Sequence, residues 1–265
     1  MSTGTYTPKP GAAPVGRMIA AQTALETRML LRNGEQLLLT VIIPSLLLVL
    51  FSTVDIVTVP VSTTGGAGEA VDFLAPGVLA LAVLSTAFTG QAIATGFERR
   101  YGVLKRLGAS PLPRWALMTA KTLSVLVTEV LQVVLLTAIA LALGWSPHGA
   151  TTFTGALSVL LLLVLGTAAF SGLGLLMAGT LKAEATLAAA NLVFLLLLVG
   201  GGVIVPLEKF GAAGDVLALL PISALSDGLR DVLQNGASMP WGDALILAVW
   251  AVLGLGAAAR FFRWE

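Results

Sequence analysis

The densest group of residues that could do chemistry is a charged run over residues 98–114, ERRYGVLKRLGASPLPR, in an otherwise apolar chain. One acidic residue, Glu98, begins the run. Five basic residues follow, namely Arg99, Arg100, Lys105, Arg106 and Arg114. Guanidinium and ammonium groups form charge-assisted hydrogen bonds with acidic partners. The run therefore predicts a surface that binds another molecule.

The spacing within this run predicts an amphipathic helix. At about 100° per residue, Glu98 and three of the cations fall within an arc of roughly 120°. The apolar residues that take the opposite side are Tyr101, Val103, Leu104 and Leu107. Gly108, Pro111 and Pro113 should end this helix, because proline removes a backbone donor and disfavours helix in the residue before it.

Glu129 is the second candidate, because it lies near the middle of a long apolar stretch with Gln132 one turn further on. A carboxylate at mid-bilayer costs ~2.5–3.5 kcal/mol on insertion scales, so it should face the bundle interior or a cavity. Two interpretations remain open. Glu129 could carry a proton or line a possible translocation path together with Gln132 and Asn191, or it could form an interhelical hydrogen bond, for example with Asn191. Asn191 by itself is more typical of helix packing than of ligand binding.

Residues for catalysis or cofactor binding are scarce. The chain has no cysteine and one histidine, His148, which we expect to be solvated in an outer loop. A phosphate-binding Gly-x-x-x-x-Gly-Lys-Ser/Thr loop is absent, since no lysine follows a glycine. We therefore expect no catalytic residue, no metal site and no cofactor site in this chain. An intramembrane enzyme would need a clustered nucleophile and base or a set of metal ligands, and is disfavoured.

Composition indicates which elements must position these residues. Of 265 residues, 57% are hydrophobic and 11% charged, with a mean hydropathy of +0.94, whereas soluble domains carry about 25% charged residues. A hydrocarbon core of ~30 Å needs about 20 apolar residues. The sequence predicts an all-α membrane protein with six transmembrane helices, at about 36–59, 73–97, 115–143, 153–178, 187–205 and 243–260. Residues 60–72 are expected to form a polar loop, and Lys121 suits the cytoplasmic interface of the third span. The many small residues of the fourth span should let it pack closely against other helices.

The distribution of basic residues predicts the topology. With the N-terminus inside, 13 of the 15 basic residues lie in or beside cytoplasmic segments, and only Lys209 and Arg230 lie elsewhere. The positive-inside rule then favours cytoplasmic N- and C-termini. Residues 1–15 are predicted to be a disordered cytoplasmic tail without the apolar core of a cleavable signal peptide. The net charge of +1 gives no support for nucleic-acid binding.

Two further segments are predicted to be helical without spanning. Residues 16–34 should form an interfacial helix whose Arg17, Arg28 and Arg32 reach anionic lipid headgroups. Glu26 falls on its apolar side, so a solvated cytoplasmic helix stays open as an alternative. Between spans five and six, an apolar run at 216–220 and an amphipathic piece at 224–233 are too short to span. They predict short re-entrant or interfacial helices.

Together these features resemble the permease subunit of the ABC-2 type transporter family over essentially the whole chain. The early basic helix, Pro76-Gly77 and the block over residues 98–112 carry the resemblance. That block is similar to the family's cytoplasmic loop, in which an acidic residue precedes Gly-x-Leu-Lys/Arg-x-Leu and Ser-Pro. More loosely, Pro206, Pro221, Leu229-Arg230 and Gly236 resemble its proline-punctuated segment before the last span. Within that family, the sequence pattern is most similar to that of bacterial drug-export permeases.

The resemblance implies a single ABC-2 type transmembrane domain over residues 16–265 in a bacterial plasma membrane. It implies a coupling helix that docks on separate ATPase subunits, which would bind ATP and Mg. The residues carried over to that contact are Glu98, Arg99, Arg100, Gly102, Lys105, Arg106, Ser110 and Pro111. A second permease, identical or homologous, would complete a path for a hydrophobic or amphipathic substrate that is exported. The alternative is an ion-coupled secondary transporter that uses Glu129.

Overall fold

The helical architecture is seen in a computed structural model that describes residues 11–53, 67–147, 152–203, 205 and 207–263. Within these ranges the chain forms helices and no strand. The tail predicted at residues 1–15 lies mostly outside them, as does His148. The helices are α1 (Val15–Arg32), α2 (Gly34–Thr53), α3 (Ala67–Val83), η1 (Leu84–Gly90), α4 (Gln91–Arg100), α5 (Val103–Gly108), α6 (Arg114–Ala142), α7 (Phe153–Thr180), α8 (Ala183–Gly200), η3 (Leu207–Phe210), α9 (Ala212–Leu217), α10 (Pro221–Leu233) and α11 (Trp241–Phe261).

Among the described residues, five helical segments are long and apolar enough to cross a membrane. They are Val71–Arg100, Arg114–Ala142, Phe153–Thr180, Ala183–Gly200 and Trp241–Phe261. These segments match the second to sixth predicted spans, so a multi-pass helical architecture is confirmed. The first predicted span coincides with α2, whose apolar part is described over Val41–Leu50. Its last residues lie outside the described ranges, so the count of six remains a prediction.

The second span differs in detail from the prediction. Residues 67–72 were expected in a loop, but they form the first turns of α3. The span then continues through η1, a seven-residue π-helical stretch, into α4. The chain therefore crosses this part of the bundle in one continuous run of 30 residues. A π-helix adds a residue to the turn and is frequent at functional sites.

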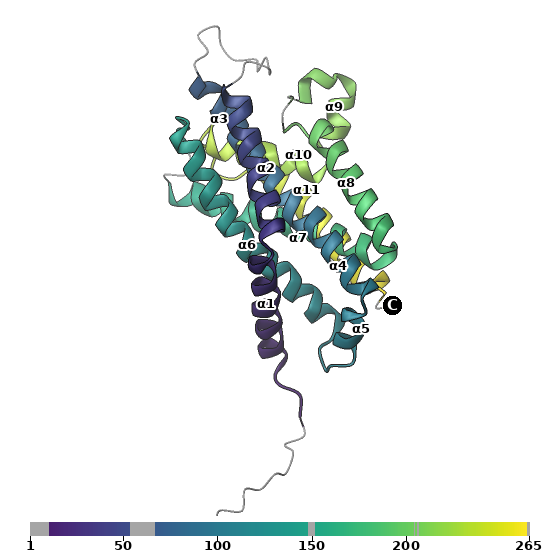
Figure 1. Cartoon of the computed structure of the whole chain (residues 1–265). Helices are drawn as coiled ribbons and strands as arrows, with labels where there is room; N and C mark the ends of the chain where they lie inside the picture. The colour runs from purple at the N-terminus through teal and green to yellow at the C-terminus, as the bar shows by residue number, and fades with distance from the viewer. Residues whose placement is uncertain (1–10, 54–66, 148–151, 204, 206, 264–265) are drawn as a thin grey trace, which may run out of the picture.

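The short helices between the fifth and sixth spans pack at one end of the bundle (Figure 1). α10 is strongly amphipathic, and its buried residues include Ile222, Leu225, Leu229 and Val232. These side chains join the main hydrophobic core together with residues of α3 and α7. α10 covers the piece predicted at 224–233, whereas the run predicted at 216–220 overlaps α9 (Ala212–Leu217) only at its first two residues. The placement of these helices relative to a membrane stays a prediction.

Small residues in α7 allow close helix packing. A Cβ atom on Gly172 would lie 2.5 Å from the backbone nitrogen of Leu255 in α11. A Cβ on Gly174 would lie 2.8 Å from the carbonyl oxygen of Phe88 in η1. Helices associate in lipid largely through such packing, because the solvent is as apolar as the side chains. The expectation that the fourth span packs closely through small residues is confirmed.

Leucine and valine side chains cover the outer faces of several spans. Val130 in α6, Leu196 in α8 and Val252 in α11 are 60%, 63% and 72% exposed. Exposed apolar surface of this extent is unusual for a soluble monomer. It is what a helical bundle surrounded by lipid requires.

Candidate functional site

The charged run of residues 98–114 forms two helices, not the single amphipathic helix that its spacing predicted. α4 ends at Arg100, and α5 begins at Val103. Gly102 separates them in the left-handed region, with φ +70°. That conformation costs residues with a Cβ about 1–2 kcal/mol, and glycine adopts it freely. The chain therefore changes direction at Gly102, and Glu98 does not share a helix with Lys105.

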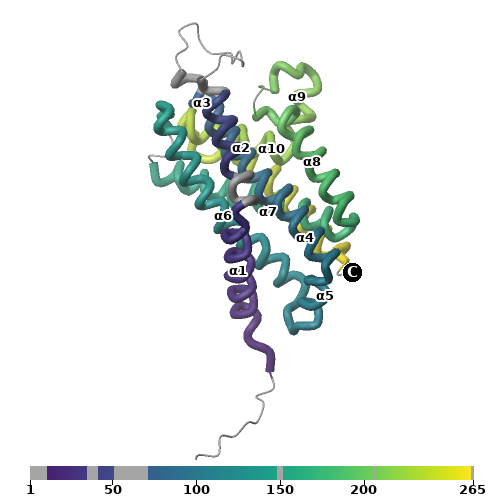
Figure 2. Tube along the Cα trace, viewed as in Figure 1, coloured from purple at the N-terminus to yellow at the C-terminus, as the bar shows by residue number. Residues whose placement is uncertain are grey.

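α5 is a short helix that is held to the bundle by one buried side chain. Leu104 is fully buried in a cluster with Leu117 and Met118 of α6, Leu175 of α7, and Ala258 and Phe262 of the C-terminal segment. Figure 2 shows this end of the chain beside α5. Lys105 and Arg106, in contrast, are exposed. The helix ends at Gly108. Two residues later the hydroxyl of Ser110 donates to the carbonyl of Leu107 at 2.5 Å, and exposed Pro111 follows.

The two arginines at the end of α4 bond to the turn between α7 and α8. Arg99 donates to the carbonyl oxygen of Leu181, and Arg100 forms an ion pair with Glu184. Both contacts lie on the exposed side of the protein. They fix the last turn of α4 against the start of α8.

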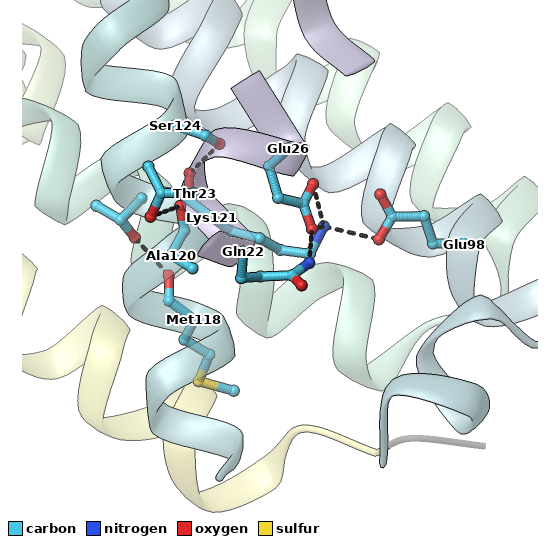
Figure 3. Close-up of polar contacts among 9 residues, drawn as sticks. Gln22, Thr23, Glu26, Glu98, Met118, Ala120, Lys121 and Ser124 are labelled. Carbon is cyan, nitrogen blue, oxygen red and sulfur yellow. Dashed lines mark hydrogen bonds and ion pairs between the residues drawn. The ribbon is translucent and has the colours of Figure 1, made fainter. Parts of the chain in front are cut away.

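Glu98 points away from these arginines and into the bundle. Its carboxylate accepts a hydrogen bond from Lys121 Nζ at 2.7 Å. The same ammonium group lies 3.1 Å from the carboxylate oxygens of Glu26. Figure 3 shows Lys121 of α6 between Glu26 of α1 and Glu98 of α4. We call these three residues the charge triad.

The charge triad is largely excluded from solvent. The side chains of Lys121, Glu26 and Glu98 are 5%, 10% and 17% exposed. Gln22 also donates to Glu26 at 2.8 Å. Ionised groups are found at such depth when they are paired and hydrogen-bonded. The triad therefore ties together three helices that are far apart in sequence.

Sequence reasoning missed two members of this triad. Lys121 was interpreted as a residue at the membrane interface, and Glu26 only as a flaw in the amphipathic pattern of α1. The signal was present, because a carboxylate on the apolar side of a helix needs a buried cation as its partner. α1 accordingly packs along α6 with Glu26 inside, and Arg17, Arg28 and Arg32 are exposed. The interfacial position of these arginines stays a prediction.

The three residues proposed for a translocation path are not brought together. Glu129 is buried and accepts a hydrogen bond from Thr167 of α7. Gln132 is buried and accepts one from Thr86 of η1 at 2.7 Å. Asn191 is exposed on α8, and its amide donates to Leu187 in the same helix at 2.9 Å. The suggested bond between Glu129 and Asn191 is therefore wrong, since Thr167 takes that place.

These contacts predict different outcomes for two substitutions of Glu129. Glu129→Gln should leave thermal stability at or above that of the parent, because the amide can still bond Thr167 without a buried charge. Glu129→Ala should lose about 1–3 kcal/mol, because truncation leaves a cavity and removes the bond between the two helices, although Thr167 can still donate to the carbonyl of Leu163. Unfolding temperatures in detergent would measure both. A glutamine variant that is stable but inactive in transport would show that the carboxyl group itself is required.

A second polar group lies on α10, at the other end of the bundle. Arg230 bonds Asp227 at 2.5 Å and Ser226 at 3.2 Å, and its guanidinium lies 4.2 Å from the ring centre of Phe73. Burial raises the pKa of Asp227, and the charge of Arg230 opposes that rise. Burial likewise lowers the pKa of Arg230, against the effect of Asp227. This group joins α10 to α3.

Metal ligands do not cluster in the described part of the chain. No group of three or more histidine, cysteine, aspartate or glutamate side chains is placed there to hold a metal ion.

Comparison with known families adds to this geometry. A model of the ABC-2 type transporter family matches residues 19–233, which is more than half of the chain. The chain belongs to this family. The match includes the charge triad, α5 and α10. Comparison with curated proteins gave no significant match.

Family membership settles the broad class of this ABC-2 permease. It is a multi-pass membrane protein and a transport subunit of an ABC transporter, and it is not itself the catalytic subunit. Such permeases work in general with an ABC ATPase. The family match gives no support to the alternative of an ion-coupled secondary transporter.

Proposed function

We propose that this ABC-2 permease exports a hydrophobic or amphipathic substrate across a bacterial plasma membrane. Separate ATPase subunits, which bind ATP and Mg, supply the energy, and a second permease completes the path. Both termini are cytoplasmic. In this arrangement α5 is the helix that the ATPase pushes.

The observation that carries the proposal is the position of α5. It lies at the end of the bundle where α1 begins and α11 finishes (Figure 1). It presents Lys105 and Arg106 outward while Leu104 is buried beneath it. Exposed cations can bond an acidic partner surface, and the buried leucine transmits movement of α5 to α6 and α7. Glu98 then contributes through its buried contact with Lys121, and it need not touch the ATPase.

Isolation of the complex tests this proposal. A tagged chain, purified from its own membrane in mild detergent, should carry an ATP-hydrolysing subunit with two permeases per assembly. The double variant Lys105→Glu/Arg106→Glu should lose that subunit. Lys209→Glu is the matched control, since this exposed lysine lies in η3, at the other end of the bundle. An ATPase that stays bound to the double variant would contradict docking through α5.

The joint between α4 and α5 supports a separate prediction. Gly102→Val should leave membrane insertion intact but uncouple ATP hydrolysis from transport, because valine disfavours φ +70° by about 1–2 kcal/mol. Gly236→Val is the matched control. Gly236 also has a positive φ, +66°, with open space around its Cβ position. ATPase rate and transport in reconstituted vesicles should diverge for Gly102→Val alone.

A further inference from the structure

A cavity of about 240 Å³ lies between α1, α4 and α6, beside the charge triad. All three members of the triad line it. Other lining residues that matter here are Gln91 and Thr95 of α4 and Ser124 of α6. The cavity thus combines buried charges with polar side chains from two spans.

Two polar side chains on this cavity wall are buried without a partner among the described residues. Gln91 is 6% exposed, and neither its amide nitrogen nor its amide oxygen is hydrogen-bonded. Thr95 is 1% exposed, and its hydroxyl likewise has no bond. Buried polar groups are nearly always hydrogen-bonded, to protein or to another molecule. An amide and a hydroxyl that lack partners on the wall of one cavity therefore indicate that the cavity binds a ligand.

The charge of the cavity indicates the sign of the charge on that ligand. Two carboxylates, Glu26 and Glu98, face one ammonium group, Lys121, so the triad carries a net charge of −1 when all three are ionised. A second cation would balance this charge, and an anion would be repelled. Lys121 lies near both carboxylate oxygens of Glu26 but bonds only one oxygen of Glu98. The second oxygen of Glu98 therefore keeps acceptor capacity for another donor.

Lining residues near the surface indicate the chemistry of the remaining part of the ligand. Met29 of α1, Tyr101 after α4 and Val103 of α5 also line the cavity, and they are 52%, 69% and 37% exposed. A molecule held at the triad would therefore lie against apolar surface as it leaves the cavity. The volume is below the range of about 300–1,000 Å³ that is typical of drug-sized pockets, so it suits a small head group.

We propose that this cavity binds the head of a small amphipathic ammonium ion. The ammonium group lies beside Glu26 and Glu98, Gln91 and Thr95 accept its N–H groups, and its alkyl chain lies along Met29, Tyr101 and Val103. This binding goes beyond transport, because it needs neither ATP nor an ATPase. It holds whether the ion is the exported substrate or a regulator.

Site-directed labelling tests the proposal, because the native chain has no cysteine and gives no background. Ser124→Cys places a thiol on the cavity wall with little change in shape. The full chain, in phosphatidylcholine nanodiscs without ATPase, is treated with trimethylammonium-ethyl and sulfonato-ethyl methanethiosulfonate. Each rate is divided by the rate of the same reagent with free 2-mercaptoethanol, because the cationic reagent is intrinsically more reactive toward thiolates. The normalised rate should be at least about tenfold higher for the cationic reagent, as a residual unit charge at short range predicts. n-Decylammonium should slow this reaction, and n-decyl sulfate should not.

Two further variants test whether the charge of the triad causes this preference and whether the cavity wall can be labelled at a second position. Glu26→Gln in the Ser124→Cys background removes the net charge, so the preference for the cationic reagent should fall toward one. Ala94→Cys provides a second thiol on the wall if the first variant does not fold, because Ala94 lines the same cavity and has no role in the proposed binding. Equal normalised rates for both reagents would mean that the cavity holds water only and would overturn the proposal. Absence of labelling at both positions in folded protein would overturn it as well.

Discussion

Replacing Lys121 with methionine is expected to destabilise this permease more than most single substitutions. The change removes the only ammonium group between Glu26 and Glu98 in the charge triad. Two buried carboxylates would then remain without their shared cation. Breaking a buried pair in this way typically costs about 3–5 kcal/mol. The free energy of unfolding, from denaturant titration of the detergent-solubilised chain, measures the loss.

A triple variant separates the lost charge from the lost packing. Glu26→Gln, Lys121→Met and Glu98→Gln together remove all three charges while nearly keeping the shapes of the side chains. Replacing a complete buried ion cluster by neutral groups is often close to neutral in stability. We expect the triple variant to be more stable than Lys121→Met alone. Equal losses in the two variants would show that the triad contributes through packing and not through charge.

The second large effect is expected at Gly172, where α7 meets α11. A methyl group there would lie 2.5 Å from the nitrogen of Leu255 and 2.6 Å from the carbonyl carbon of Gly254. Both atoms are backbone, so no side chain can rotate away, and the two helices must separate. Overpacking costs about 1–3 kcal/mol when side chains can adjust. Gly172→Ala should lose at least the upper end of that range.

Gly256→Ala provides the matched control for Gly172→Ala. Gly256 lies in the middle of α11, and its Cβ position has open space around it. The same chemical change should therefore alter stability by less than about 1 kcal/mol, with a stabilising sign, because alanine favours helix. Unfolding temperature and the yield of monodisperse protein would compare the two variants. Similar values for both would contradict a backbone contact at Gly172.

The spans could be predicted from the sequence because each is a long apolar run with few charges. Segments such as Phe153–Thr180 need no tertiary information to be recognised, since lipid dictates both their length and their composition. The small residues of α7 likewise predicted close packing. The start of α3 was misplaced because residues 67–72 are polar enough to resemble a loop.

The candidate site could be predicted only in outline. Wheel geometry assumes an unbroken helix, and it failed at Gly102 because a single left-handed residue redirects the chain. The pairing of Lys121 with Glu26 joins residues 95 positions apart. A span and a preceding helix must pack before this contact exists, so local pattern does not reveal it. The same limit applies to Glu129, whose partner Thr167 lies on another span.

The end of α4 has bonds in two opposite directions. Glu98 attaches it inward to Lys121 of α6, which also bonds Glu26 of α1, and Arg100 attaches it outward to α8. A displacement of α5 therefore cannot move α4 independently of the helices bonded to it. A force on α5 would be shared among α1, α4, α6 and α8 at once, so its energy would be distributed over much of the end of the bundle at which α5 lies.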